Sequence, residues 1–379
     1  MKGKQGLVCM GLLLVLSSCS CHTGKQITAS GLQRKDFQTE VNGQHTDLFT
    51  LSNKQGMEVC ITNYGARVVS ILVPDRNGKR EDVVCGFSTI TEYMEQRQNF
   101  GSTVGRYIGR ILNARFTLDG VEYKLVPNNG KSGHISHGGN PGFADRIWKV
   151  EQADTHRVRL SYLSPDGENG FPGNLKVTLV YSLGEDDNAL DLTYEATTDA
   201  PTVLNLSHHS FFNISGNFTK SVEDQQLWVD ADRFTPYDDK KCVTGEYLQV
   251  AGTPLDFRMP HTIGECIDAD HPQLKVVNGY DHTWELNTKG DDTRPAAWVY
   301  DPASGRKMEI FTTEPGMQIY TGNGLKGKMT GKGGIAYPFR SAVCFETMHF
   351  QDSPNQPGFP STVLRPGEVF RSHTVYKFE

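Results

Sequence analysis

The sequence lacks the features that mark several large classes of protein. Its 38 Lys and Arg are outnumbered by 44 Asp and Glu, which gives a net charge of −6, and no basic block stands out. Surfaces that bind nucleic acid are normally basic and clustered, so we expect no nucleic-acid partner. Long runs rich in Ala, Leu, Glu and Lys are also missing, which argues against a mainly helical protein.

Motifs of nucleotide-dependent enzymes and of serine hydrolases are missing too. The sequence has neither a dinucleotide-binding fingerprint nor a GxSxG nucleophile elbow. The segment GNGLKGKM at 322–329 has the GxxxxGK skeleton of a phosphate-binding loop, but Met329 stands where Ser or Thr would bind magnesium. We therefore expect a glycine-rich surface loop there.

The eight cysteines lack the paired spacing of a metal site, such as CxxC. Cys60, Cys85 and Cys344 lie within apolar stretches, so we expect them to be buried free thiols. An exported protein could form disulfides, but the sequence identifies no pair.

The first residues resemble a bacterial lipoprotein signal. Two lysines stand within the first four residues, 7–16 is an apolar run too short to span a bilayer, and LSSC ends at Cys19. We expect 1–18 to be a signal peptide, Cys19 to be lipidated and 19–35 to be a tether. The exported protein would then be held at the membrane by its lipid anchor alone, facing the periplasm or the cell surface. Ordinary secretion with cleavage nearby is the alternative.

Residues 36–379 read as strand, turn and strand with few interruptions. Apolar and polar residues alternate through stretches such as MEVCITNYGARVVSILVP and the three strands expected within 156–197. The cluster DRNGK and the pair Asp119–Gly120 supply hairpin turns. The clearest helical stretch is short, at 89–98, and no linker divides the segment. We therefore predict one large antiparallel all-β domain whose length favours a stacked sandwich.

Several polar residues stand where they need an explanation. Glu346, in AVCFETMHF, shares a strand face with apolar residues, so its carboxylate is either a structural ion-pair partner or a poised base. Asp281 could cap a turn, and Gln318 could be a satisfied core amide. Arg110 could be solvated. His137 precedes two glycines, which would let the backbone approach a ligand closely.

The stretch NLSHHSFFNI at 205–214 places two histidines side by side in a strand-like run. Successive strand side chains point to opposite faces, so only one of His208 and His209 can easily serve a site. A zinc centre could use five histidines, but their spacing does not fit HExxH, and we expect no metal. These histidines are His134, His137, His208, His209 and His282.

Seven strings occur in the order seen in aldose 1-epimerases. They are GRYIGRI, ISHGG, NLSHHSFFNI, NGYDHTW, PGMQIYTGN, CFET and NQPGFPSTVLRPGE. The chain from about residue 36 onward thus resembles this family. The resemblance implies a galactose-mutarotase-like β-supersandwich, no cofactor, and interconversion of the α and β anomers of free aldohexoses such as galactose and glucose.

The resemblance also implies roles for individual residues. Glu346 matches the family's general base and His209 its general acid. The substrate-binding positions match Arg110, His137, Asp281 and Gln318. An acid and a base on either side of the ring C–O bond can open a pyranose without metal, nucleotide or covalent adduct.

Three positions depart from the family pattern. His208 stands in place of the usual Asn, Phe211 in place of Tyr, and Gly109 in place of the Asn that commonly precedes the binding arginine. The departures leave both catalytic positions intact and bear on substrate preference.

Three other functions remain open at this stage. They are a non-catalytic sugar-binding lipoprotein on the same fold, a glycosidase using Glu346 and Asp281, and an epimerase of phosphorylated sugars. The last would need a cluster of Arg and Lys at the site.

Overall fold

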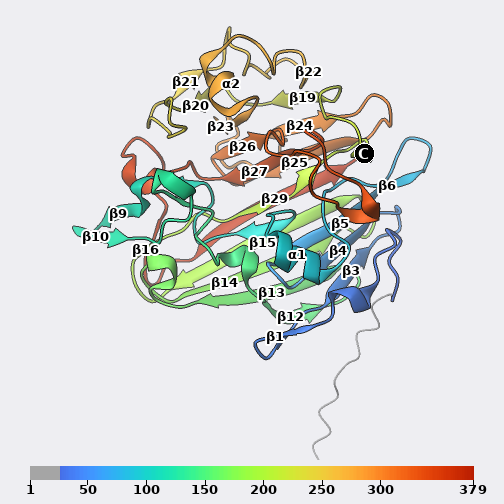
Figure 1. Cartoon of the computed structure of the whole chain (residues 1–379), viewed down its shortest axis with the longest axis horizontal. Helices are drawn as coiled ribbons and strands as arrows, with labels where there is room; N and C mark the ends of the chain where they lie inside the picture. The colour runs from blue at the N-terminus through green and yellow to red at the C-terminus, as the bar shows by residue number, and fades with distance from the viewer. Residues whose placement is uncertain (1–25) are drawn as a thin grey trace, which may run out of the picture.

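The computed structural model describes residues 26–379, and strands make up most of its regular structure (Figure 1). One layer is a nine-stranded antiparallel sheet. In spatial order its strands are β12 (Lys149–Ala153), β13 (Arg157–Ser164), β14 (Leu175–Leu183), β15 (Ala189–Thr198), β29 (Phe370–Phe378), β25 (Lys307–Thr312), β24 (Ala297–Tyr300), β19 (Gln226–Val229) and β22 (His261–Thr262).

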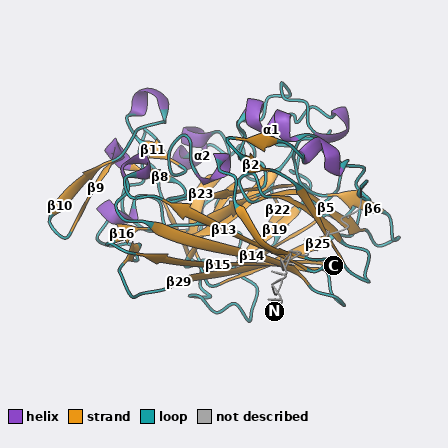
Figure 2. Ribbon diagram, turned by 90° about the horizontal axis from the view of Figure 1, so that it is seen from below, coloured by secondary structure: helices purple, strands orange, loops and turns teal. Residues whose placement is uncertain are grey.

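Two smaller antiparallel sheets pack against the large one. The four-stranded sheet contains β3 (Leu48–Ser52), β4 (Glu58–Thr62), β5 (Arg67–Pro74) and β6 (Arg80–Asp82). The six-stranded sheet contains, in order, β18 (Phe211–Phe212), β27 (Val343–Met348), β26 (Gly316–Tyr320), β23 (Asp281–Glu285), β20 (Arg233–Thr235) and β21 (Leu248–Gln249). Figure 2 shows strands β14, β15 and β29 along one side of the molecule and most helical segments on the opposite side.

Five strand pairs complete the architecture. They are β1 (Glu40–Val41) with β2 (Gln44–His45), β7 (Ser102–Val104) with β17 (Ser207–His209), β8 (Arg110–Ile111) with β11 (Ile135–Ser136), β9 (Arg115–Leu118) with β10 (Val121–Lys124), and β16 (Thr202–Val203) with β28 (Val363–Leu364).

The main hydrophobic core lies between the sheets. Along β14, alternate residues from Leu175 to Leu183 are buried and the intervening ones are more exposed, as a strand with one face on a core requires. The same core cluster contains Val59 from β4 and Phe345 from β27. Three sheets therefore share one core, which confirms the predicted all-β sandwich.

Two predicted hairpin turns are present and have clear physical causes. The Asp75 carboxylate accepts hydrogen bonds from the backbone N–H groups of Asn77 and Lys79, between β5 and β6. Asp119 and Gly120, between β9 and β10, have φ values of 51° and 79°. Two residues with positive φ form the turn that matches the natural twist of a hairpin.

Helices are few and short, as predicted. Helix α1 (Ile90–Gln96) begins with a capping box between Thr89 and Glu92, inside the predicted helical stretch. Helix α2 (Pro272–Val277) was not predicted, because six residues are too few for a periodic pattern. No helix within the described chain is long and apolar enough to cross a membrane. The 3₁₀ segments are Arg34–Phe37, Leu112–Ala114, Gly130–Ser132, Phe143–Asp145, Glu168–Gly170, Lys332–Gly334 and Ser353–Asn355.

The packed chain begins before residue 36, where we expected a tether to end. Leu32 is buried, and the backbone N–H of Ala29 donates to the Glu58 carboxylate at 2.6 Å. Apolar burial and one charge-assisted hydrogen bond thus tie residues of the expected tether to β4. The expected signal peptide and the lipidated Cys19 lie outside the described residues.

Five cysteines fall in the described chain, and all are free thiols. Cys60, Cys85 and Cys344 are buried, as predicted from their apolar surroundings. Cys242 and Cys266 are partly exposed.

Candidate active site

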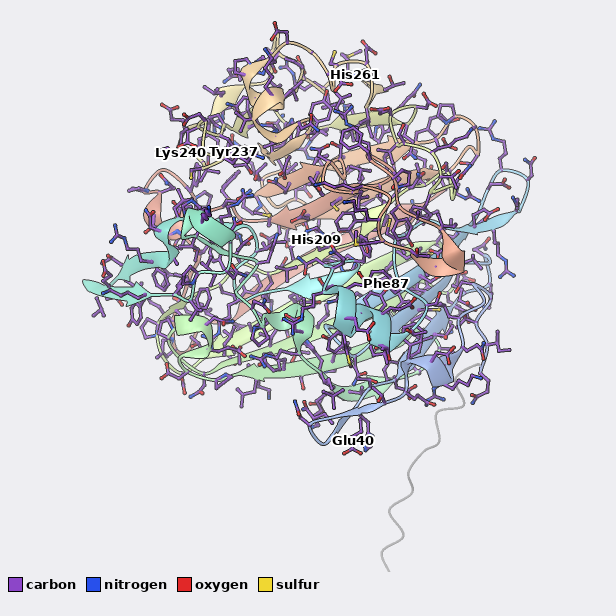
Figure 3. The ribbon with its side chains drawn as sticks, viewed as in Figure 1. Glu40, Phe87, His209, Tyr237, Lys240 and His261 are labelled. Atoms are coloured by element: carbon purple, nitrogen blue, oxygen red, sulfur yellow. The ribbon has the colours of Figure 1, made fainter. Side chains whose placement is uncertain are left out.

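One cavity of about 260 Å³ collects all six site residues expected from the sequence. Arg110 opens β8, Asp281 opens β23, His137 directly follows β11, and the others lie within strands. In Figure 3 His209 lies near the centre of the molecule and Tyr237 closer to its edge. The residues that meet in the cavity are Arg110, His137, His209, Asp281, Gln318 and Glu346.

Strand register explains why three of these side chains share one face. Thr283 of β23 pairs with Gln318 of β26, which pairs in turn with Glu346 of β27. Directly paired residues point to the same side of a sheet, as do residues two apart along one strand. Asp281, two residues before Thr283, therefore joins Gln318 and Glu346 on the cavity face of the six-stranded sheet.

The side chains of His208 and His209 point to opposite faces of the strand, as the alternation predicts. His209 lines the cavity, while His208 is buried with its ring 6.1 Å from those of both Tyr181 and Tyr376. His208 Nε2 lies 2.6 Å from Ser210 Oγ, which satisfies that nitrogen inside the core. His208 is thus a core residue, and His209 is the histidine available for chemistry.

The expected acid and base lie in direct contact in the cavity. His209 Nε2 lies 3.4 Å from Glu346 Oε1, and their side chains are only 7% and 5% exposed. Within residues 26–379, Glu346 has no other ion-pair partner. Neither Arg nor Lys pairs with Glu346 in this part of the chain, so an imidazole stands beside a carboxyl in a site that largely excludes water.

Burial moves the proton affinities of this pair in opposite directions. It raises the pKa of the Glu346 carboxyl well above its usual range; nearby Asp281 adds to the rise and Arg110 opposes it. Burial also lowers the pKa of His209 well below 6.5, and His137 adds to that fall. Both shifts follow from the cost of charge in a dry site. Burial thus favours the arrangement with a neutral carboxyl at Glu346 and a neutral ring at His209.

His137 and Arg110 flank the pair with one neutral and one charged group. Burial, helped by Arg110, lowers the pKa of His137 to about 4, so its ring is neutral at neutral pH. The rings of His137 and His209 lie 5.4 Å apart in an edge-to-face arrangement. A neutral imidazole and a guanidinium are both suited to donating to sugar oxygens.

The glycines after His137 lie against other parts of the protein. A Cβ on Gly138 would lie 1.9 Å from the carbonyl oxygen of Gly105, and one on Gly139 would lie 2.5 Å from Cγ of Asn169. Both glycines also have positive φ. They allow close contact with other parts of the protein, which holds His137 in place.

Asp281 and Gln318 form a hydrogen-bonded network at the cavity wall. Gln318 Nε2 donates to Asp281 Oδ1 at 2.7 Å, and Gln318 Oε1 accepts from Thr283 Oγ1 at 2.5 Å. Burial raises the pKa of Asp281, while Arg110 and the bond from Gln318 oppose the rise. Gln318 is thus both a satisfied buried amide and a cavity residue, and Asp281 does not cap a turn.

Further cavity residues were not singled out from the sequence. Tyr320 and Met348 could have been found by alternation, since each lies two residues beyond a predicted site residue on the same strand. Residues supplied by loops gave no such signal. The additional polar lining residues are Gln98, Asn99, Ser136, Tyr320 and Gln351.

The five histidines named as possible zinc ligands, all in the described chain, do not converge on one metal site. His134 accepts from the backbone of Asn113 at Nδ1, and His282 Nδ1 accepts from Asp281 N–H. In the described part of the chain, one group of three potential ligands converges, namely His209, Cys344 and Glu346. Burial raises the pKa of the Cys344 thiol well above its usual value, which disfavours the thiolate that a metal would need.

Two departures from the family pattern lie in the cavity. Phe211 stacks on His209 with ring centroids 5.1 Å apart and an interplanar angle of 16°. An apolar ring thus covers one face of the imidazole and keeps water from it. Gly109 lines the cavity next to Arg110.

The chain is similar to known proteins over most of its length. The aldose 1-epimerase family model matches residues 47–377. Galactose mutarotase from Bos taurus is 40% identical over 331 residues, covering 87% of this chain and 93% of its own length. Aldose 1-epimerase from Escherichia coli is 36% identical over 339 residues, covering 89% and 96%.

Solved structures show the same similarity. The crystal structure of an aldose epimerase homologue from C. elegans superposes with a TM-score of 0.81 at 31% identity, covering 88% of this chain and 99% of that one. Galactose 1-epimerase from Lactobacillus acidophilus has a TM-score of 0.78 at 28% identity, with coverage of 90% and 97%.

Proposed function

The chain belongs to the aldose 1-epimerase family and is a mutarotase, and we propose that Glu346 and His209 carry the proton transfers by which it interconverts the α and β anomers of free aldohexoses. The observation that carries this assignment is the 3.4 Å contact between His209 Nε2 and Glu346 Oε1 inside one water-excluding cavity. The two oxygens of a hemiacetal are bonded to one carbon, so an acid and a base acting on them must be close neighbours.

Ring opening needs one proton removed and one supplied. Glu346 takes the proton of the anomeric hydroxyl as the C1–O5 bond breaks, and His209 gives its proton to O5. Rotation about the C1–C2 bond turns the other face of the aldehyde toward the new hydroxyl. Reversal of both transfers then closes the ring as the other anomer, and the enzyme returns to its starting protonation state.

The pKa directions fit this cycle. Ring opening carries the pair from Glu346 carboxylate and His209 imidazolium to Glu346 carboxyl and neutral His209. The second arrangement is the one that burial favours. Ring opening neutralises both charges inside the dry site, which favours the two proton transfers. Before the reaction, binding groups such as Arg110 stabilise the Glu346 carboxylate.

We predict that kcat/KM for galactose stays flat as pH rises through 6.5. A lone imidazole acid would lose its proton there, and activity would fall. Here burial raises the pKa of Glu346 and lowers that of His209, which widens the pH range over which the pair holds a single proton. We therefore expect that proton to stay in the pair through pH 6.5, and the two limbs of the profile are properties of the pair as a whole. Polarimetry between about pH 5 and 9, corrected for buffer-catalysed mutarotation, measures the profile. A one-proton loss of activity centred near pH 6.5 would contradict the prediction.

The proposed function is tested with freshly dissolved α-galactose and α-glucose. The purified protein is expected to accelerate the change in optical rotation of either sugar, and rates with xylose and arabinose define its preference. Arg110 is the one Lys or Arg among the described cavity residues, which supports a neutral substrate over a phosphorylated one. Galactose 6-phosphate is therefore expected not to compete at low micromolar concentration. The absence of any acceleration would defeat the proposal.

We also propose that the protein is exported and anchored through a lipid on Cys19. Support comes from the two early lysines, the short apolar run at 7–16 and the LSSC sequence. In a bacterial host supplied with labelled palmitate, the full chain is expected to take up label and partition into detergent. Cys19→Ala should lose both properties, whereas Cys21→Ala, the matched neighbour, should keep them. Equal labelling of the two variants would exclude lipidation at Cys19 and favour ordinary secretion.

A further inference from the structure

Gly109 and Gln351 compete for the same space beside Arg110. Gly109 has a φ of 74°, and a Cβ built on it would lie 2.6 Å from Cγ and 3.1 Å from Cδ of Gln351. Such distances are far below van der Waals contact, so a side chain at 109 and the present position of Gln351 exclude each other. The similar family commonly carries Asn at the position of Gly109.

Gln351 places a carboxamide of its own in the cavity. The residue is 4% exposed and lines the cavity. Its Nε2 donates to Tyr237 OH at 2.6 Å and to Gln318 Oε1 at 3.3 Å. These bonds fix the amide in one orientation and connect it to the Gln318–Asp281 network.

The carbonyl oxygen of Gln351 is left for a ligand. No group in residues 26–379 donates a hydrogen bond to Oε1, although both donors of Nε2 have acceptors. Gln351 lines the cavity, and an amide oxygen without a protein donor can accept a hydrogen bond from a ligand there. A sugar hydroxyl in the cavity would supply the missing donor.

We propose that Gln351 is a specificity-determining residue that accepts a hydrogen bond from one hydroxyl of the sugar, replacing the carboxamide that Asn at position 109 would provide. The inference rests on the proposed mutarotase function. The carboxamide reaches the sugar from the loop after β27 instead of from the segment before β8, so it approaches from a different direction. Substrate preference should differ accordingly from that of relatives with Asn at this position.

Gln351→Ala is expected to lower kcat/KM for the preferred sugar by about 3- to 10-fold, mainly through KM, which is the usual size of one neutral hydrogen bond. The pH profile should not move, because the proton-transfer pair is intact. Gln152→Ala, an exposed glutamine on β12, is the matched control and should behave as wild type.

Gly109→Asn supplies the reciprocal test. Asn tolerates positive φ, so the backbone permits it, but its side chain collides with Gln351. The single variant should therefore lose activity, and the double variant Gly109→Asn/Gln351→Ala should be more active than either single one. If the single Gly109→Asn variant fails to fold, Gln351→Ala and the double variant still give the comparison.

Deoxygalactoses identify the hydroxyl and separate binding from a structural role. For the one deoxy sugar that lacks the contacted hydroxyl, wild type and Gln351→Ala should have equal kcat/KM. A purely structural Gln351 would lower the rates of all the sugars by the same factor, and that result would overturn the inference. So would an unchanged KM for every sugar, or a double variant no better than Gln351→Ala. An inactive wild-type protein would instead defeat the proposed function itself.

Discussion

Glu346→Gln is expected to reduce the catalysed rate of mutarotation by about 10²- to 10⁴-fold, the usual contribution of a general base. The amide has the shape of the carboxyl group but cannot take the proton of the anomeric hydroxyl. Folding should be preserved, because burial already favours the neutral form at this position and an amide is neutral. Sugar binding should survive in part, since the cavity keeps its volume and its other polar groups. Initial rates of optical rotation, together with urea denaturation, measure both effects.

Glu314→Gln is the matched control for that variant. Glu314 is also a buried glutamate, but its carboxylate lies 2.7 Å from His349 Nδ1 and does not line the cavity. The control is expected to lose stability, because a charge-assisted pair is removed, and to keep its rate per folded molecule. A Glu346→Gln variant with the wild-type rate would remove the base from the mechanism.

His209→Asn is expected to have an effect of similar size, about 10²- to 10⁴-fold on the rate. Asparagine can still donate a hydrogen bond to the ring oxygen, but it cannot deliver a proton to it. The loss should therefore appear in kcat more than in KM. The imidazole ring of His209 also stacks on Phe211, so its removal is expected to lower the stability of the protein modestly.

His208→Asn is a sharp control, because it changes the adjacent residue to the same amino acid. The side chain of His208 lies in the core between Tyr181 and Tyr376, away from the cavity. Its loss should affect unfolding by urea and leave the rate of the folded enzyme unchanged. Equal rates for His209→Asn and wild type, or a comparable loss in His208→Asn, would contradict the assignment of the acid.

Much of the fold could be predicted from local rules. Alternation of apolar residues identified β13, β14 and β15, because a strand with one face on a core must repeat every two residues. Asp119–Gly120 identified a hairpin, because few residues adopt two consecutive positive φ values. The short helix α2 and the packing of Leu32 were not predictable, since neither has a periodic pattern and both depend on distant partners.

The candidate site was predictable by residue type and motif but not by contact. Glu346 attracted attention as a carboxylate on an apolar strand face, and alternation separated His208 from His209. Their meeting at 3.4 Å depends on how β17 and β27 are placed by different sheets. The packing of Gly138 was not predictable for the same reason, since only the folded chain shows that Gly105 lies against it.

The sequence by itself determined the all-β architecture, the family, and which residue types could exchange protons with a sugar. These follow from periodicity, turn chemistry and the order of motifs, all of which are local along the chain. The tertiary structure decided which groups share a dry cavity, in which direction burial shifts the pKa of Glu346 and His209, and that Gln351 occupies the space beside Gly109. Desolvation and steric exclusion act between residues far apart in the chain, so their outcome is fixed only when the sheets have packed.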